Sequence, residues 1–292
     1  MWSTHHPPVD YGRVGRDLRA AIITGVLLGG AIIASLVFFN FGFILIMAGL
    51  LVLATIELGH NFGRRNIKVA TVPVAIGTGL AVILPYLAQY IPSLSGGSLG
   101  RNAVLVSLLA LTTIVALAWR MPGGAQGFLT DVSASLFLIA YVPLLGSFAA
   151  LLLSGDHGVA RVLTYVLVVV GSDLGGYVAG VLFGRHPMAP VISPKKSWEG
   201  FVGSVVFATV AAVLMSIYGL RIDWWVGLIL GPLLVAVATV GDLVESLIKR
   251  DLGIKDMSSF LPGHGGVMDR LDSMLLAAPI AWLIMYLLVP GG

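Results

Sequence analysis

Long apolar runs, separated by short polar segments, dominate the chain. An α-helix needs roughly 20 apolar residues to cross a hydrocarbon layer of about 30 Å, and these runs have about that length. Backbone amides cannot stay unpaired in lipid, and the runs lack the alternation of a barrel strand, so the pattern predicts helices. The predicted spans are residues 18–39, 41–58, 67–88, 103–119, 128–153, 159–183, 200–219, 224–241 and 274–289. The predicted fold class is therefore all-α, a polytopic integral membrane protein with about nine transmembrane helices.

The segments between the spans are short except for residues 184–199 and 242–273, where we expect the functional groups to lie. No segment is long enough for a separate soluble domain, so the sequence predicts a single membrane-embedded catalytic domain over residues 1–292. Its N-terminal spans cover about residues 18–153, and its catalytic part covers about residues 159–289. The first span is longer than the core of a signal peptide, which predicts a retained helix.

Lys and Arg residues near membrane spans stay on the cytoplasmic side, so their distribution predicts the orientation. With the N-terminus placed in the cytoplasm, all but three of the 17 Lys and Arg residues fall on the cytoplasmic side. The exceptions are Arg101, Arg161 and Arg221. A miscounted span in the middle of the chain would move every later segment to the other side and destroy this separation. The sequence therefore predicts a cytoplasmic N-terminus and a C-terminus on the opposite side.

The composition supports the membrane class and excludes several kinds of chemistry. The chain is 58% hydrophobic and 11% charged, against about 25% charged residues in an average soluble domain. It has no cysteine, so disulfides, thiolate catalysis and zinc–thiolate sites are excluded. Much of the net charge of +3 belongs to the orientation signal, and we expect no nucleic-acid partner. Neither a P-loop nor a dinucleotide-binding glycine motif occurs, so any nucleotide must be held by the membrane domain itself.

Two pairs of carboxylates stand at helix ends in the longer polar segment. Asp242 and Glu245 are three residues apart near the end of one predicted span, and Asp269 and Asp272 are three apart near the start of the next. This spacing puts each pair on one face of a helix. Such carboxylates form a hard oxygen site suited to Mg²⁺, which takes the rest of its ligands from water and substrate phosphates. The alternative is that the second pair merely favours a helix N-terminus.

Basic residues lie among these carboxylates, as a site for polyphosphate and metal together requires. They are Lys249, Arg250, Lys255 and Arg270. Asp173, inside a predicted span, needs a partner such as a cation, a lysine or a metal, or else it is a charge satisfied between helices. In PGHGG, residues 262–266, the glycines permit a sharp turn or close backbone approach to a ligand. His264 either donates to a phosphate or is structural.

The other polar segment contains ISPKKSWEG, residues 192–200. Ser193 is predicted to cap a helix whose first residue is a proline, which would place helix amides beside Lys195 and Lys196 as an anion site. The alternative is a basic membrane anchor with a tryptophan in the interfacial belt. In the span before it, residues 176, 180 and 184 are glycines at four-residue spacing. They predict close approach of another helix.

The polar segments resemble those of a known family. SLIKRDLGIKDMSSFLPGHGGVMDRLD, residues 246–272, is similar to the signature of the CDP-diacylglycerol synthases, or phosphatidate cytidylyltransferases. SDLGGYVAG and SPKKSWEG also resemble that family, so the likeness in motifs covers about residues 170–289. The resemblance implies an integral membrane enzyme that uses CTP, phosphatidic acid and Mg²⁺ to make CDP-diacylglycerol and pyrophosphate. It further implies a homodimer and a monovalent cation such as K⁺ beside the Mg²⁺.

The residues and the resemblance together define the candidate site. The resemblance implies that Asp242 and Asp269 are the metal ligands. The candidate catalytic residues are Asp242, Asp269, Asp272, Lys249, Arg250, Lys255, Asp256 and His264. The candidate substrate-binding residues are Ser193, Lys195, Lys196, Ser246, Gly265, Gly266, Arg270 and Asp173.

We expect a prokaryotic cell (inner) membrane location with the site facing the cytoplasm. The alternatives are a CTP-dependent transferase acting on another lipid, such as an archaeal ether lipid, a related polyprenol kinase, or a cation-coupled membrane transporter. Transporters usually have repeated halves and binding groups near the midplane, whereas the charges here gather at one face. A purely structural membrane protein would have no ligand to offset so many paired charges.

Overall fold

The computed structural model describes residues 18–91, 98–261 and 265–290, and most of them are helical. The helices are α1 (Leu18–Phe38), α2 (Asn40–Arg64), α3 (Thr71–Leu87), α4 (Ser98–Arg120), α5 (Phe128–Ile139), α6 (Leu145–Leu153), α7 (Gly158–Phe183), α8 (Trp198–Leu214), α9 (Trp225–Leu252) and α10 (Met268–Leu288). Short 3-10 helices, η2 (Ala88–Tyr90) and η3 (Met121–Gly123), and π-helices, η4 (Ala140–Leu144) and η5 (Met215–Gly219), adjoin them. Strands β1 (Pro187–Ala189) and β2 (Ser193–Ser197) form a small hairpin. The predicted all-α class is confirmed.

Eight helical runs in the described part of the chain are long and apolar enough to cross a membrane. They correspond to eight of the predicted spans, and one of them joins α5, η4 and α6. The first predicted span corresponds to α1, in which Gly25–Phe38 forms a shorter apolar helix. The polytopic membrane class is therefore confirmed, whereas the ninth span and the orientation remain predictions.

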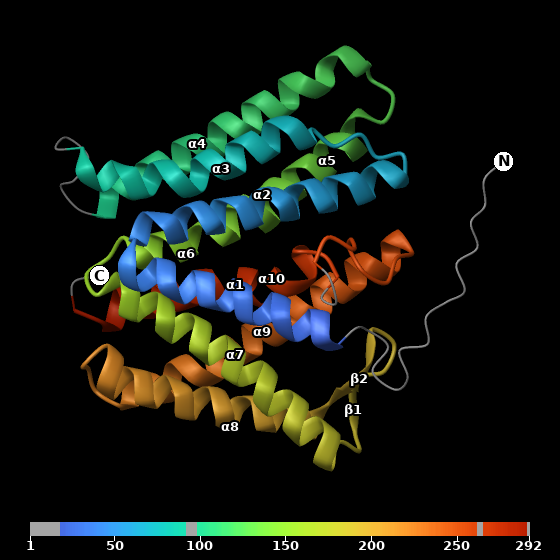
Figure 1. Cartoon of the computed structure of the whole chain (residues 1–292). Helices are drawn as coiled ribbons and strands as arrows, with labels where there is room; N and C mark the ends of the chain where they lie inside the picture. The colour runs from blue at the N-terminus through green and yellow to red at the C-terminus, as the bar shows by residue number, and fades with distance from the viewer. Residues whose placement is uncertain (1–17, 92–97, 262–264, 291–292) are drawn as a thin grey trace.

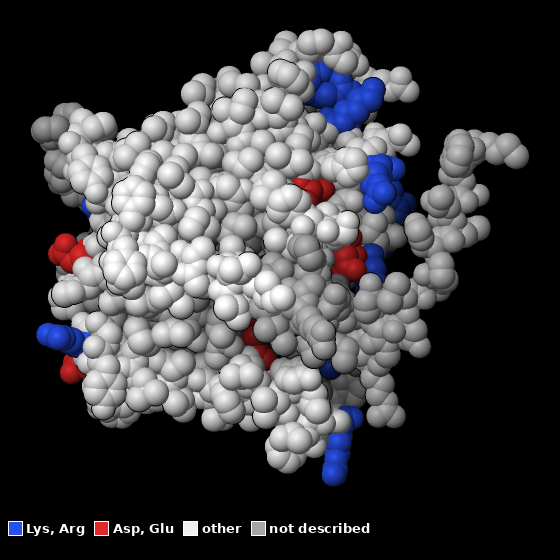
Figure 2. Space-filling model, viewed as in Figure 1, with Lys and Arg blue, Asp and Glu red and all other residues white. Residues whose placement is uncertain are grey.

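The helices run roughly parallel and form a bundle (Figure 1). α2 packs on α3 and α3 on α4, α7 packs on α8, and α9 contacts both α8 and α10. One end of the bundle carries β1, β2 and the C-terminal end of α9, and α10 ends at the opposite end (Figure 1). In the same view, Lys and Arg side chains gather mainly at the end that carries the hairpin (Figure 2). This distribution fits the predicted asymmetry of the basic residues.

Glycines bring α7 and α8 into close contact, as their spacing predicts. A Cβ at Gly175 would lie 2.5 Å from the carbonyl oxygen of Gly203, and a Cβ at Gly176 would lie 2.5 Å from Oγ of Ser204. Real Cβ atoms do not approach so closely, so larger residues there would force the helices apart. The helix that these glycines admit is α8, whose Ser204 donates through Oγ to the carbonyl of Ser172, the residue before Asp173, at 2.6 Å.

The segment before α8 corrects one prediction. Ser193 does not cap a helix, because residues 193–197 are extended and pair with β1, with Ala189 opposite Ser193. The cap is Ser197, whose Oγ accepts a hydrogen bond of 3.1 Å from the amide of Gly200. Pairing with β1 satisfies the backbone of residues 193–197 in the extended form, so the helix starts four residues later than predicted.

The polar segment between the last two helices is also shorter than predicted. α9 continues to Leu252 and α10 begins at Met268, so about half of residues 242–273 is helical. Arg65 of the α2 end stabilises the extension, because its guanidinium donates to the carbonyls of Asp251 at 2.8 Å and Leu252 at 3.1 Å. These terminal carbonyls have no partner within their own helix. The extension puts the candidate site residues of α9 on a rigid element.

A buried arginine links two helices at the opposite end of the bundle. Arg161 is 3% exposed and donates to the carbonyls of Asp156 at 2.8 Å and of Met285 and Val289 at 3.3 Å each. It therefore joins the start of α7 to the C-terminal end of α10, far from the hairpin end.

Candidate functional site

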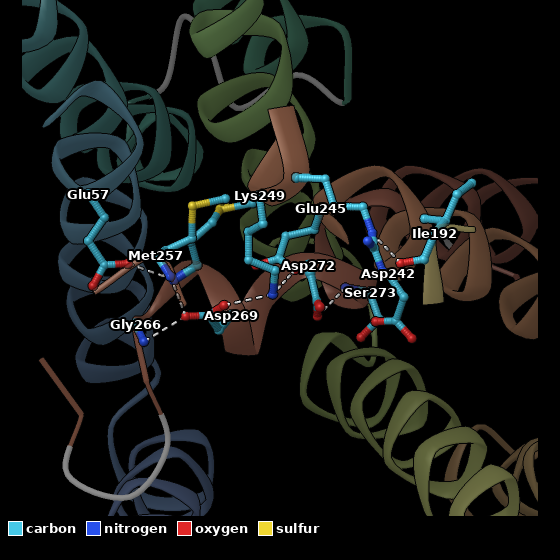
Figure 3. Close-up of polar contacts among 12 residues, drawn as sticks. Glu57, Ile192, Asp242, Glu245, Lys249, Met257, Gly266, Asp269, Asp272 and Ser273 are labelled. Atoms are coloured by element: carbon cyan, nitrogen blue, oxygen red, sulfur yellow. Dashed lines mark hydrogen bonds and ion pairs between the residues drawn. The ribbon is translucent and has the colours of Figure 1, made fainter. Parts of the chain in front are cut away.

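Lys249 stands at the centre of an ion-pair cluster between α9 and α10 (Figure 3). Its ammonium pairs with the carboxylate of Glu245 one turn earlier on α9 and with Oδ1 of Asp269 on α10, the latter at 2.9 Å. Glu245 is 1% exposed and Asp269 is 8% exposed. Buried charges need such partners because their loss of hydration is expensive. The structure brings Lys249 and Asp269 together, and it also brings in Glu245, which the sequence paired with Asp242 but which the candidate list omitted.

Asp269 also organises the segment between the two helices. Its Oδ2 accepts hydrogen bonds from the amides of Met257 at 2.9 Å and Gly266 at 2.8 Å. A Cβ at Gly266 would lie 2.7 Å from Oε2 of Glu57, and Gly265 has a positive φ of 85°. The two glycines therefore permit a sharp turn packed tightly on the protein's own carboxylates.

Glu57 of α2 anchors the same segment from across the bundle. Its Oε1 accepts from Oγ of Ser258 at 2.5 Å and from the amide of Val267 at 3.0 Å, and its Oε2 accepts from the amide of Met268 at 2.9 Å. A carboxylate is favourable there because the first amides of α10 lack intrahelical acceptors. The candidate list omitted Glu57, although an acidic residue inside a predicted span already indicates a function.

A pocket of about 240 Å³ lies between α7, β2, α8 and α9. Asp173, Lys195, Lys196 and Asp242 are among the residues that line it. Lys196 forms an ion pair with Asp242 across the pocket, and the basic groups that act on Asp173 are Lys196 and Arg270. The structure thus brings together residues that the sequence placed in separate segments. Asp173 thus shares the pocket with two lysines, and of these Lys196 pairs with Asp242.

Asp272 lies between the pocket and the Lys249 cluster (Figure 3). Its Oδ1 accepts from the amide of Ser273 at 2.7 Å, and its carboxylate faces those of Asp242 and Glu245. Neighbouring carboxylates repel one another unless a proton or a cation lies between them. Asp272 therefore joins the two groups of charges into one acidic surface.

The remaining candidates lie at the edge of this site. Arg250 is exposed, and its Nε donates to the carbonyl of Ile192 at 2.6 Å, which ties the hairpin to α9. Lys255 is exposed, Asp256 is half-buried near Gly265, and Ser246 is half-buried on α9. Ser193 is a half-buried residue of β2 and Arg270 is exposed on α10. His264 lies outside the described residues, so its role stays a prediction.

The model of the cytidylyltransferase family matches residues 19–288. The chain belongs to this family. Phosphatidate cytidylyltransferase of Mycobacterium bovis is 42% identical over 285 residues, covering 97% of this chain and 92% of the relative. The phosphatidate cytidylyltransferases of Mycobacterium leprae and Staphylococcus haemolyticus are 40% and 33% identical, covering 94% and 87% of this chain. The resemblance inferred from the sequence is confirmed, and the family match extends it to the N-terminal spans.

In this member of the cytidylyltransferase family, the donor chemistry suits a hard cation such as Mg²⁺. The site contains five carboxylates, those of Asp173, Asp242, Glu245, Asp269 and Asp272. Asp242 pairs with Lys196, and Glu245 and Asp269 pair with Lys249. No group of three metal-binding side chains among the described residues is arranged to hold a metal as it stands. Both oxygens of Asp269 are already engaged, whereas the adjacent carboxylates of Asp242 and Asp272 combine into an acidic face. Asp242 with Asp269 as the metal pair stays a prediction.

Proposed function

We propose that the chain transfers a cytidylyl group from CTP to phosphatidic acid, giving CDP-diacylglycerol and pyrophosphate. The observation that carries this proposal is the pocket in which Asp173, Lys195, Lys196 and Asp242 meet at the hairpin end of a membrane bundle. Membership of the cytidylyltransferase family and the names of the relatives support the same reaction. A phosphate oxygen of phosphatidate attacks the α-phosphorus of CTP. The bond from that phosphorus to the bridging oxygen breaks, and the electron pair leaves with pyrophosphate.

The protein groups bind and orient the phosphates and need not form a covalent intermediate. Lys195 and Lys196 hold phosphate oxygens in the pocket, and Lys196 exchanges its contact with Asp242 for one with substrate. Lys249 keeps Asp269 and Glu245 in place. When bound by Asp242 together with Asp269 or Asp272, Mg²⁺ supplies charge neutralisation at the phosphate oxygens.

The membrane setting completes the proposal. The chain is an integral membrane protein, and the curated relatives are bacterial. We place it in a prokaryotic inner membrane with the hairpin end facing the cytoplasm, where CTP is found. The gathering of basic residues at that end supports this orientation (Figure 2). From the resemblance we also propose a homodimer, which light scattering in detergent tests. A requirement for K⁺ is proposed on the same ground, and activity after replacement of K⁺ by Na⁺ tests it.

The direct test is formation of CDP-lipid by the purified protein in detergent. Each of the four nucleoside triphosphates is offered with phosphatidate, with and without Mg²⁺. Among these conditions, we expect turnover only when both CTP and Mg²⁺ are present. If none of the four nucleotides supports turnover, the proposal is refuted. An ether-linked phosphatidate assayed beside the ester tests the alternative lipid. Ion flux in proteoliposomes without CTP turnover would instead indicate a transporter.

The residue-level test is Asp269→Asn. We expect kcat to fall at least about 100-fold, because the change weakens the contact with Lys249 and places an amide donor among the amides that Asp269 accepts from. Asp251→Asn is the matched control, since Asp251 is exposed near the end of α9. An Asp269→Asn enzyme that keeps most of its kcat would exclude Asp269 from the metal and phosphate site.

A further inference from the structure

Tyr141 is a buried residue to which the proposed reaction assigns no role. It lies in the π-helix η4 between α5 and α6 and is 5% exposed. Pro143 in the same turn lacks an amide hydrogen, which disturbs the regular helical hydrogen bonds there. Single π-turns inside helices are rare and occur frequently at functional sites. The backbone that carries this side chain is therefore irregular.

The hydroxyl of Tyr141 has no hydrogen-bond partner among the described residues, although it is buried. Its ring is held in place, because it stacks on Phe137 with ring centres 5.2 Å apart and planes at 16°. A buried hydroxyl without a partner loses its hydrogen bond to water and gains nothing in return. A partner is therefore expected in some state of the molecule.

The charged groups that act on this hydroxyl are all carboxylates. They are those of Asp272, Glu245 and Asp242, with Asp272 first. Oε1 of Glu245 is likewise buried and without a partner among the described residues. A buried donor without a partner among the described residues thus lies within electrostatic reach of carboxylates that repel one another. A hydrogen bond from Tyr141 would satisfy the donor and reduce the charge density on one carboxylate.

We propose that Tyr141 is a positioning residue, whose hydroxyl donates to one carboxylate oxygen of Asp272 and leaves the other oxygen directed at a divalent cation. The inference rests on the proposed function for its metal, and it concerns a residue outside the sequence motifs. Groups that orient metal ligands in this way typically change metal affinity by about 10- to 100-fold when they are removed. Tyr141 contacts neither substrate in this proposal.

The test uses Mn²⁺ as the probe, without nucleotide or lipid. Electron paramagnetic resonance measures free Mn²⁺ as the full-length protein in detergent is titrated. We expect Tyr141→Phe to raise the Mn²⁺ dissociation constant about tenfold. It should leave the metal-free unfolding temperature unchanged or higher, since the lost hydroxyl has no partner among the described residues. Tyr86→Phe is the matched control, because Tyr86 is also 5% exposed but lies near the opposite end of the bundle. It should leave Mn²⁺ affinity unchanged.

A double-mutant cycle with Asp272→Asn separates positioning from a general effect on the fold. If Tyr141 acts through Asp272, adding Tyr141→Phe to Asp272→Asn should not weaken Mn²⁺ binding further. Equal Mn²⁺ affinity of Tyr141→Phe and the parent, independent losses from the two changes, or absence of Mn²⁺ binding by the parent would each overturn the proposal. Mn²⁺ binding that depends on Tyr141 in a protein that makes no CDP-lipid would refute the proposed function and leave this inference standing.

Discussion

Replacing Glu57 with glutamine tests whether a residue of α2 holds the site between α9 and α10 in place. The three donors to its carboxylate are the Ser258 hydroxyl and the amides of Val267 and Met268. Glutamine removes the negative charge and turns one acceptor into an NH₂ donor that faces these donors. Hydrogen bonds to a charged group are worth about 1.5–3 kcal/mol each, and a carboxylate at a helix N-terminus adds about 0.3–1 kcal/mol. Since one acceptor oxygen remains, we expect a loss of about 2–4 kcal/mol in the free energy of unfolding.

The measurement is SDS-driven unfolding in mixed micelles, followed by tryptophan fluorescence. Glu199→Gln is the matched control, because Glu199 pairs with the exposed ring of His186 and accepts from the amides of Arg185 and His186 near the surface. Exposed pairs of this kind contribute little, about 0–1 kcal/mol. Glu57→Gln should also lower kcat, since Asp269 depends on the same segment. A Glu57→Gln protein within about 0.5 kcal/mol of the parent would show that the carboxylate does not anchor this segment.

Three further predictions concern the pocket, the far end of the bundle and the helix contact. Lys196→Ala should raise KM for a phosphate-bearing substrate about tenfold, equivalent to about 1.4 kcal/mol, and unchanged steady-state kinetics would make Lys196 a membrane anchor. Arg161→Met should lower the free energy of unfolding by about 2–3 kcal/mol, because buried carbonyls lose a charged donor. The kcat of Arg161→Met per folded molecule should match that of the parent, and a lower kcat would contradict a purely structural role. Gly176→Ala should lower kcat by forcing Oγ of Ser204 away, whereas Gly29→Ala, with open space around it, should not. Equal kcat for the two alanine variants would show that the contact between α7 and α8 tolerates a methyl group.

The helices and the chemical character of the site were predictable because they depend on local properties of the chain. The length of an apolar run determines whether it can cross a bilayer. A charge inside such a run is unfavourable unless it has a partner, so the acidic residues of an apolar chain indicate a site wherever they stand. By this criterion Asp173 was found, and Glu57 could have been. The start of α8 was misplaced because Ser193 and Ser197 are both good caps, and pairing with β1 selects the second.

The sequence alone therefore determined the membrane class, the family and the set of charged residues, because the length of an apolar run and the spacing of a motif are properties of one contiguous segment. Only the tertiary structure decided which charges meet. Lys196 pairs with Asp242 although 46 positions separate them, and Ser258 bonds to Glu57 across 201 positions. Helix packing brings such residues together, and a buried charge is stable beside whatever counter-charge that packing supplies. Tyr141 likewise belongs to no sequence motif, and it becomes a candidate only because α9 and α10 bring three carboxylates within electrostatic reach of its buried hydroxyl.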